Sequence, residues 1–373
     1  MDITDIKTYV MWAEGAGRNW MFVKVETDEG IHGWGEGTLV NQVRTIAEAV
    51  HMLAPQIVGQ SAFDIERHWQ TMYLHNRYRN GVIISSALSA IDQALWDIKG
   101  KALGVPVYQL LGGAVRNRIR TYTGADSVEV AQTAVEQGFT AIKSGWGYSM
   151  IDLDERREPA MFRDHIAMMR DAVGPDIDVM VDNHGRSRPA MAIKLIRSIE
   201  EYNLLFFEEP VPPNNFDSLA LVRQAGLATE LATGERLLTR WGNKDVIERQ
   251  LVDVLQPDVC HCGGISELRR IAAMAETYYI NMAFHNPKGP VATAASIHVA
   301  ASIPNFLILE HVSRIPVFDE IQVEPMELGG GYYELPTAPG LGVDLNEEVF
   351  ESYPYRYRPV LYASHEDGAP AHP

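Results

Sequence analysis

Six polar residues recur along this sequence at intervals of about 25 positions. Consecutive members are separated by 26, 27, 23, 27 and 25 positions, and each lies at the end of a short apolar or β-branched run. The six residues are Asp182, Glu208, Glu235, Asp258, His285 and Glu310. A strand and the helix that follows it take up about this length, so the spacing predicts repeated strand–helix units with a polar group ending each strand.

Eight short apolar runs beyond Arg116 fit the strands of such units, and segments with helical spacing alternate with them. The runs are residues 119–123, 140–143, 179–181, 204–207, 231–233, 252–256, 280–284 and 306–309. Eight parallel strands with helices between them predict an α/β fold with a barrel of the TIM type. Because the C-terminal ends of barrel strands form one rim, we expect the six polar groups to converge there.

The first part of the chain, up to about Val115, predicts a separate α+β unit. Three strands are expected, at residues 6–11, 20–26 and 31–36. Three helices are expected, at residues 43–53, 63–73 and 85–103. After Gly342 the tail is polar and irregular, and we expect it to pack back on this first unit.

The composition limits the partners and the location of the chain. A formal net charge of −17 disfavours nucleic acid and anionic membranes as partners, because the long-range field would repel both. No apolar run is long enough to span a bilayer and residues 1–5 do not resemble a signal peptide, so a soluble cytoplasmic protein is expected. Cys260 and Cys262 are too close for an ordinary disulfide and too few for a structural zinc site, so we expect both to be reduced.

Asp182, Glu208 and Glu235 supply three carboxylates from consecutive strands. Carboxylate oxygens are hard ligands that suit Mg²⁺ better than zinc. The alternative is that three unrelated acidic residues cap helices. Buried carboxylates repel one another unless a cation lies among them, so their shared place at strand ends favours a metal site.

Two histidines are candidate acid–base groups. Asp258 and His285 end adjacent strands. A hydrogen bond from the imidazole ring to the Asp258 carboxylate would raise the basicity of the ring, which makes His285 a candidate base. The alternative is a structural histidine. His184 follows Asp182 by two positions and should point to the same side, as a metal ligand, an acid or a loop residue. If His184 faces His285 across the barrel, one can remove a proton and the other can deliver one.

Lys143 and Glu310 end two further strands. Lys143 is predicted to bind substrate or act electrostatically, with a purely structural role as the alternative. It lacks the second lysine two positions later that a lysine pair would require. Glu310, if protonated, is a candidate to hydrogen-bond a developing enolate, or it could contact the region of the substrate carboxylate. The alternative is an ion pair with a neighbouring arginine or lysine.

Five segments resemble the mandelate racemase subgroup of the enolase superfamily, and the likeness covers essentially the whole chain. They are residues 89–100 (SAIDQALWDIKG), 207–210 (FEEP), 234–236 (GER), 256–258 (QPD) and 262–265 (CGGI). The resemblance implies a modified (β/α)₇β barrel at residues 118–338, an α+β capping domain at residues 1–117, and a segment at residues 339–373 that packs back on the capping domain. It also implies Mg²⁺ on Asp182, Glu208 and Glu235, removal of a proton α to a carboxylate, and a homo-oligomer, commonly an octamer.

Within that subgroup the chain resembles the dehydratases of aldonic acids such as D-galactonate. The likeness lies in Trp20-Met21-Phe22, in His184-Gly185-Arg186, and in His285 followed by Pro287, Gly289 and Pro290. It implies that His285, paired with Asp258, takes the α-proton, while His184 protonates the leaving β-hydroxyl. Glu310 would stabilise the intermediate. The substrate would be a small acid sugar, D-galactonate or a close stereoisomer, and the product a 2-keto-3-deoxy sugar acid.

Several positions near the expected site differ from the dehydratase pattern and leave the identity of the sugar acid open. They are Asn183, Asn286, Lys288 and residues 146–161 and 311–314. Substrate contacts are predicted for Arg18, Trp20, Lys143, Asn183 and Asn286. Two other functions remain as alternatives: a racemase or epimerase, disfavoured because a second strand-end lysine is lacking, and a binding protein, disfavoured because the carboxylates and both histidines are present.

Overall fold

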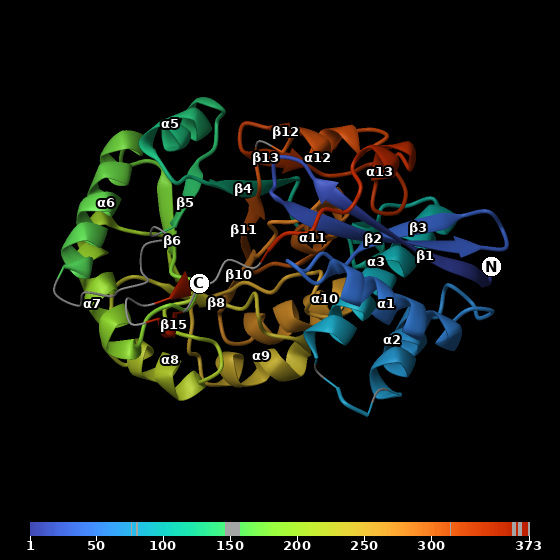
Figure 1. Ribbon diagram of the computed structural model, residues 1–373, viewed down its shortest axis with the longest axis horizontal. Coiled ribbons are helices and arrows are strands. Elements are labelled where there is room, and N and C mark those ends of the chain that lie inside the picture. The colour runs from blue at the N-terminus through green and yellow to red at the C-terminus, as the bar shows by residue number, and fades with distance from the viewer. Residues whose placement is uncertain are drawn as a thin grey trace.

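The computed structural model describes residues 1–75, 77–79, 81–145, 157–313, 315–359, 363–364 and 368–371. A closed parallel barrel lies beside a smaller three-stranded antiparallel sheet that is covered by helices (Figure 1). This arrangement confirms the predicted α/β barrel with a separate α+β unit. None of the described helices is both long and apolar enough to cross a bilayer.

Eight parallel strands form the barrel, and each predicted run overlaps one of them. In ring order they are β4 (Arg118–Gly124), β5 (Ala141–Gly145), β6 (Asp178–Asp182), β7 (Phe207–Glu208), β8 (Leu231–Thr233), β9 (Val254–Leu255), β10 (Asn281–Phe284) and β11 (Phe306–His311). Leu309 on β11 pairs with Thr121 on β4 and so closes the ring. A short hairpin that the sequence did not predict, β12 (Leu328–Gly329) and β13 (Tyr332–Glu334), pairs antiparallel with the start of β4.

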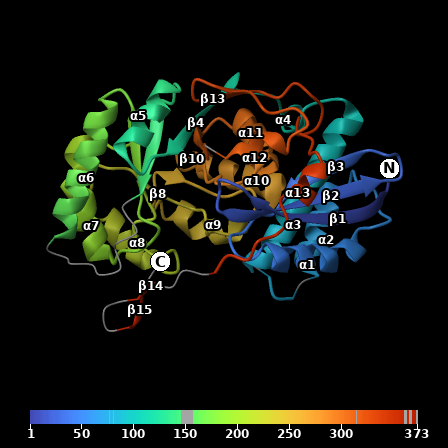
Figure 2. The ribbon, with the colours of Figure 1, turned by 45° about the horizontal axis from the view of Figure 1, so that its top comes forward.

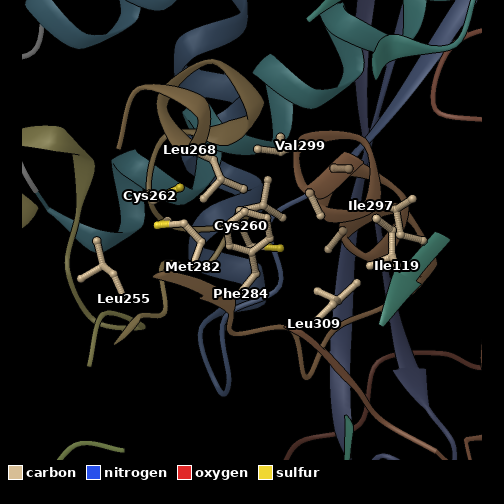
Figure 3. Close-up of a cluster of buried hydrophobic side chains, with 14 of the residues drawn as sticks. Ile119, Leu255, Cys260, Cys262, Leu268, Met282, Phe284, Ile297, Val299 and Leu309 are labelled. Atoms are coloured by element: carbon tan, nitrogen blue, oxygen red, sulfur yellow. The ribbon is translucent and has the colours of Figure 1, made fainter. Parts of the chain in front are cut away.

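Helices surround the barrel and pack on its outer face. They are α5 (Val128–Glu136), α6 (Glu158–Val173), α7 (Pro189–Ile199), α8 (Phe216–Arg223), α9 (Thr239–Glu248), α10 (Gly264–Glu276) and α11 (Pro290–Ser302). Strand side chains alternate between the barrel interior and this helix layer. On β10, Met282 and Phe284 join the outer cluster that includes Leu268 and Val299 (Figure 3), whereas Ala283 joins the cluster inside the barrel.

Each of the eight strands contributes one side chain to the interior of the barrel, and for β7 this is the residue just before the strand. These are Tyr122, Ala141, Met180, Phe206, Ala232, Val254, Ala283 and Ile308. Because apolar side chains fill the middle of the barrel, the polar residues lie beyond them at the C-terminal rim. Cys260 and Cys262 are buried and unbridged, as predicted, in the loop after β9.

The first unit is a three-stranded meander with helices packed on one face. Its strands are β1 (Ile3–Ala13), β2 (Arg18–Thr27) and β3 (His32–Glu36), and its helices are α1 (Val43–Leu53), η1 (Ala54–Gln56), α2 (Ile65–Leu74), α3 (Val82–Leu103) and α4 (Val107–Leu110). The three predicted strands and the three predicted helices are confirmed, α1 with the ends that were predicted. Ile46, Val50 and Leu53 line the buried face of α1, as the helical spacing indicates.

Helix α3 joins this unit to the barrel. Gly33 and Gly35 let β3 approach α3 so closely that a Cβ at Gly35 would lie 1.8 Å from the carbonyl oxygen of Ala90. Elsewhere on α3, Asp92 accepts hydrogen bonds from the backbone N (3.0 Å) and the Oγ (2.6 Å) of Ser266, in the first turn of α10. The first N–H groups of a helix lack partners within it, so Asp92 caps a barrel helix from outside the barrel.

The part of the C-terminal segment around residues 348–354 lies against the sheet of the first unit, whereas the end of the chain lies away from that sheet (Figures 1 and 2). The backbone N of Trp12 donates to the carbonyl oxygen of Tyr353 (2.8 Å), and the ring of Phe350 in α13 (Glu348–Ser352) stacks 4.7 Å from that of Tyr9. The remaining elements are η2 (Glu200–Tyr202), α12 (Pro316–Glu320), β14 (Ala363–Ser364) and β15 (Pro370–Ala371). The boundaries between the three expected domains stay a prediction.

Candidate active site

A cavity of about 790 Å³ opens at the C-terminal ends of the barrel strands. The barrel lines most of it, and Arg18, Leu39 and Val40 of the first unit complete it. Its charged and titratable residues are Arg18, Asp126, Lys143, His165, Asp182, His184, Arg186, Glu235, Arg236, His261, His285, Lys288 and Glu310. Groups that lie far apart in the sequence therefore meet at the rim.

Asp182, Glu208 and Glu235 lie together at the ends of β6, β7 and β8. Each residue offers one carboxylate oxygen, and these three oxygens all lie within 4.8 Å of one another. The structure therefore brings together the three residues predicted as metal ligands. An all-oxygen set of this kind suits a hard divalent cation such as Mg²⁺, with water or substrate completing its coordination.

The electrostatics of these carboxylates also fit a bound cation. Burial raises the pKa of Asp182 to about 6 and that of Glu208 to about 7, and the charge of Asp182 adds to the effect on Glu208. The buried Oε1 of Glu208 has no hydrogen-bond partner among the described residues. A divalent cation would bind this oxygen and offset the repulsion between the carboxylates, so the residues present fit a metal site.

Lys143 reaches this group from β5. Its Nζ donates to Glu208 Oε2 (3.0 Å) and lies 3.1 Å from Glu310 Oε1 and 3.7 Å from Asp182 Oδ2. Burial favours a lower pKa for Lys143, but the charges of Glu208 and Glu310 outweigh it and hold the pKa well above its usual value. Glu310 therefore forms the ion pair with a neighbouring lysine that the sequence left open as the alternative, and the backbone N of Asn286 donates to its other oxygen (3.0 Å).

His285 lies between two carboxylates just after β10. Its Nδ1 is 2.7 Å from Asp258 Oδ2, and its Nε2 is 3.0 Å from Glu235 Oε2. Burial favours a lower pKa for His285, but Glu235 and Asp258 raise it well above its usual value. The contact with Asp258 orients the ring so that Nε2 faces the carboxylate group at the centre of the cavity.

His184 lies across the barrel from His285. Strands β6 and β10 are four places apart in the ring of eight, so the two histidines stand on opposite walls. The backbone of His184 is left-handed, with a φ of 49°, and its N donates to Asp182 Oδ1 (2.7 Å). Desolvation of the part of the ring that faces the cavity lowers the pKa of His184 to about 4, against the opposing effect of Glu235, although 49% of the side chain is exposed. The ring is thus neutral in the ligand-free site, and an anionic substrate would raise its pKa.

Three of the five predicted substrate contacts do not reach the cavity. Trp20 is fully buried in an aromatic cluster. The amide of Asn183 donates to two backbone oxygens (3.1 and 3.2 Å), and that of Asn286 donates to a threonine hydroxyl (2.9 Å) and a backbone oxygen (3.1 Å). None of the three side chains lines the cavity, and those of Asn183 and Asn286 turn into the protein beside histidines that do. A role for the three residues in substrate binding stays a prediction. Arg18 and Lys143 do line it.

The sequence did not assign a role to several residues that the structure places at the cavity. Lys288 is buried, and its Nζ lies 3.1 Å from Asp258 Oδ2 and 3.0 Å from His261 Nε2. Asp126 lines the cavity just after β4, and extending the repeat of polar strand ends backward by two units would have found it. Of the segment 146–161, which differs from the dehydratase pattern, residues 146–156 lie outside the described residues.

Comparison with known proteins identifies the family. The family pattern described as "Mandelate racemase / muconate lactonizing enzyme, N-terminal domain" matches residues 14–112, and that described as "Enolase C-terminal domain-like" matches residues 126–349. The chain belongs to the mandelate racemase/muconate lactonizing enzyme family. This family is part of the enolase superfamily, as the sequence motifs predicted.

Curated relatives within the mandelate racemase/muconate lactonizing enzyme family narrow the reaction class. The D-galactonate dehydratase of Ralstonia pickettii (strain 12J) is 41% identical over 362 residues, which cover 94% of this chain and 93% of the relative. That of Ralstonia nicotianae (strain ATCC BAA-1114 / GMI1000) is 40% identical over 389 residues, covering 100% of both. The chain is an enzyme, a hydro-lyase similar to these proteins.

A solved structure similar to this chain supports the fold. It is an enolase from Agrobacterium radiobacter, provisionally named a galactarate dehydratase and bound to sodium and L-malate. The TM-score is 0.93 at 32% sequence identity, and the match covers 100% of both chains. The names of these relatives differ in one respect that bears on the substrate: galactonate has one carboxylate and galactarate has two.

Proposed function

We propose that this enzyme removes water from an aldonate, D-galactonate or a close stereoisomer, and forms a 2-keto-3-deoxy sugar acid. The observation that carries this proposal is the position of His184 and His285 on opposite walls of one cavity, with three carboxylates between them. Elimination of water requires a base at the α-carbon and an acid at the β-hydroxyl. Each wall can supply one of them.

His285 is the proposed base. The α-proton of a carboxylate is very weakly acidic, so its removal requires an oriented base and stabilisation of the charge that develops. The base must start as a neutral ring, and Glu235 would raise the pKa of His285 less if its charge were offset by a bound cation. The 2.7 Å contact with Asp258 then holds the ring and stabilises the imidazolium that forms when Nε2 takes the proton. The electron pair of the broken C–H bond stays with the substrate and forms the new carbon–carbon double bond.

His184 is the proposed acid. Hydroxide is a poor leaving group, so the β-hydroxyl requires a proton as its bond to carbon breaks. The bond from the backbone N to Asp182 fixes the left-handed turn that directs His184 to the cavity. The proton from His184 and the departing hydroxyl leave as water, and the resulting enol converts to the 2-keto product.

Mg²⁺ is the proposed cofactor, and Asp182, Glu208 and Glu235 would hold it. When bound, Mg²⁺ supplies positive charge beside the substrate carboxylate. Lys143 adds a second positive charge next to the same residues, and Glu310 holds Lys143 in place through their ion pair. Local cations are needed because the whole chain has a formal net charge of −17 and would otherwise repel an anionic substrate.

A panel of aldonic and aldaric acids, incubated with the enzyme and Mg²⁺, tests the proposal. We expect a 2-keto-3-deoxy acid from D-galactonate or one of its stereoisomers, detected by mass spectrometry as the loss of one water. Absence of a keto acid from every aldonate would contradict the proposal.

A racemase or epimerase is the second candidate, because two histidines on opposite walls could also act as two bases. Deuterium incorporation at the α-carbon with inversion, and without keto acid, would support it. The variant His184→Asn separates the two functions. In a dehydratase it should slow elimination by at least about 100-fold and affect α-proton exchange less, since His285 is intact. Equal loss of both rates would contradict an acid role for His184.

The proposed ligand is a small acid sugar, with neither nucleic acid nor membrane as a partner. The proposed assembly is a homo-oligomer, with an octamer as the size to test. Light scattering of the purified enzyme measures the mass of the assembly, and a monomer at micromolar concentration would contradict this part of the proposal.

A further inference from the structure

One wall of the cavity carries polar groups that the proposed chemistry does not use. Four residues at the ends of β4 and β5 and on α6 line it: Gly124, Asp126, Gly145 and His165. Gly124 and Gly145 are the last residues of their strands, and Asp126 follows Gly124 by two positions. This wall thus offers one carboxylate and one imidazole beside two residues without side chains.

The two glycines leave space in front of the Asp126 carboxylate. A Cβ at Gly145 would lie 3.7 Å from Asp126 Oδ1, and a Cβ at Gly124 would have no neighbour within 4 Å among the described residues. Asp126 is exposed and lines the cavity. Its carboxylate therefore lies close to the end of β5, with space beside it as far as the described residues extend.

His165 is held beside Asp126. Its Nε2 lies 2.8 Å from the Oγ of Ser144, whose side chain is fully buried, and the charge of Asp126 acts on its ring. A buried hydroxyl on one edge of the ring restricts its rotation. The His165 ring is therefore held in place before a ligand binds, which lowers the entropy cost of binding a ligand to it.

The position of this wall in the ring of barrel strands determines which part of a substrate contacts the wall. Strands β4 and β8 are four places apart in the ring of eight, so Asp126 lies across the cavity from Glu235. A substrate with its carboxylate at the three proposed metal ligands and its α- and β-carbons between the two histidines extends its remaining carbons away from the ligands. In an aldonate these carbons carry hydroxyl groups, and in an aldarate they end in a second carboxylate.

We propose that Asp126, with His165 behind it, binds the distal hydroxyl groups of the substrate and makes the enzyme select aldonates over aldarates. This inference rests on the proposed function. A carboxylate accepts hydrogen bonds from two hydroxyl groups, and such bonds are stronger when the acceptor is charged. The same charge repels a second carboxylate, so one residue favours one class of substrate and disfavours the other. Asp126 is thus a specificity-determining residue.

The variants Asp126→Asn and Asp126→Ala test this assignment on three substrates. These are the aldonate that the wild type turns over fastest, the aldarate of the same configuration, and a four-carbon aldonate that lacks the distal hydroxyls. We expect kcat/KM for the long aldonate to fall about 10- to 100-fold. The four-carbon aldonate should change by less than about twofold, since it makes no contact with Asp126. The ratio of aldarate to aldonate turnover should rise at least about tenfold.

The variant Glu129→Gln is the matched control, because it removes a charge from α5 outside the cavity and should leave all three rates unchanged. Thermal unfolding checks that the Asp126 variants are folded, which we expect because the residue is exposed. Equal losses on the long and short aldonates, or an unchanged preference against the aldarate, would overturn the inference. The inference would also be overturned if Arg18→Met, and not the Asp126 variants, lowered kcat/KM more for the long aldonate than for the four-carbon aldonate. A wild-type enzyme that dehydrates no aldonate would overturn the proposed function, and this result appears before any variant is compared.

Discussion

At the scale of single residues, the pair of His285 and Asp258 gives the sharpest test of the base. In the variant His285→Asn the amide can keep a hydrogen bond to Asp258 but cannot accept the proton. We expect exchange of the substrate α-proton with deuterated solvent to fall by at least about 100-fold. Nuclear magnetic resonance of the recovered substrate measures this exchange. Exchange at the wild-type rate would exclude His285 as the base.

The buried carboxylate of Glu208 tests the metal site separately from activity. A ligand that binds only the folded state stabilises it by about 2.7 kcal/mol at 100 times its Kd, so added Mg²⁺ should raise the Tm of the wild type. Glu208→Gln removes a charged ligand, and both the rise in Tm and the dehydratase activity should shrink together. Glu276→Gln, an exposed change on α10, is the control. A full Mg²⁺-dependent rise in Tm for Glu208→Gln would remove Glu208 from the ligand set.

At the scale of elements, the close contact between β3 and α3 depends on the absence of a side chain at Gly35. In the variant Gly35→Ala the new Cβ would lie 1.8 Å from the backbone oxygen of Ala90, and backbone cannot rotate aside as a side chain can. We expect the free energy of unfolding to fall by about 1–3 kcal/mol or more. Urea denaturation measures this. Gly81→Ala is the control, because a Cβ there would have no neighbour within 4 Å among the described residues, and equal effects of the two changes would contradict the close packing.

The helices and strands could be predicted from this sequence more completely than which side chains face the cavity. Barrel strands require local apolar runs, so all eight were found, and the spacing of polar strand ends located His285 and the three carboxylates that could hold a metal. Asn183 and His184 are neighbours, however, and only the left-handed turn at His184 decides which of them faces the cavity. The burial of Lys288 rests on contacts between residues far apart in the chain, which no local pattern encodes.

At the scale of the whole molecule, the cavity exists only where the first unit meets the barrel. The barrel supplies the two histidines and the carboxylates, while Arg18, Leu39 and Val40 of the first unit complete the wall. Helix α3 holds this junction, since it packs on the sheet that carries Arg18 and caps α10 through Asp92. Changes at the junction should therefore affect substrate binding as well as stability.

Asp92 makes the stability of this junction depend on pH. Burial raises the pKa of Asp92 to about 7, although the hydrogen bonds from Ser266 oppose this. A carboxyl group that binds its proton more tightly when folded stabilises the fold at low pH, and this contribution is lost as the pH rises from about 4 to about 7. Asp92→Asn can keep the bonds to Ser266 without ionising. Its free energy of unfolding relative to wild type should therefore rise across that range, by up to about 4 kcal/mol.

Urea denaturation of both proteins at several pH values between about 5 and 8 measures this difference. Asp176→Asn is the matched control, because it makes the same chemical change at an exposed position. A difference for Asp92→Asn that stays constant with pH would mean that Asp92 is already ionised in the folded protein. The α10 cap would then carry a charge, and its replacement by a neutral amide should instead lower stability by the same amount at every pH, by about 0.5–2 kcal/mol.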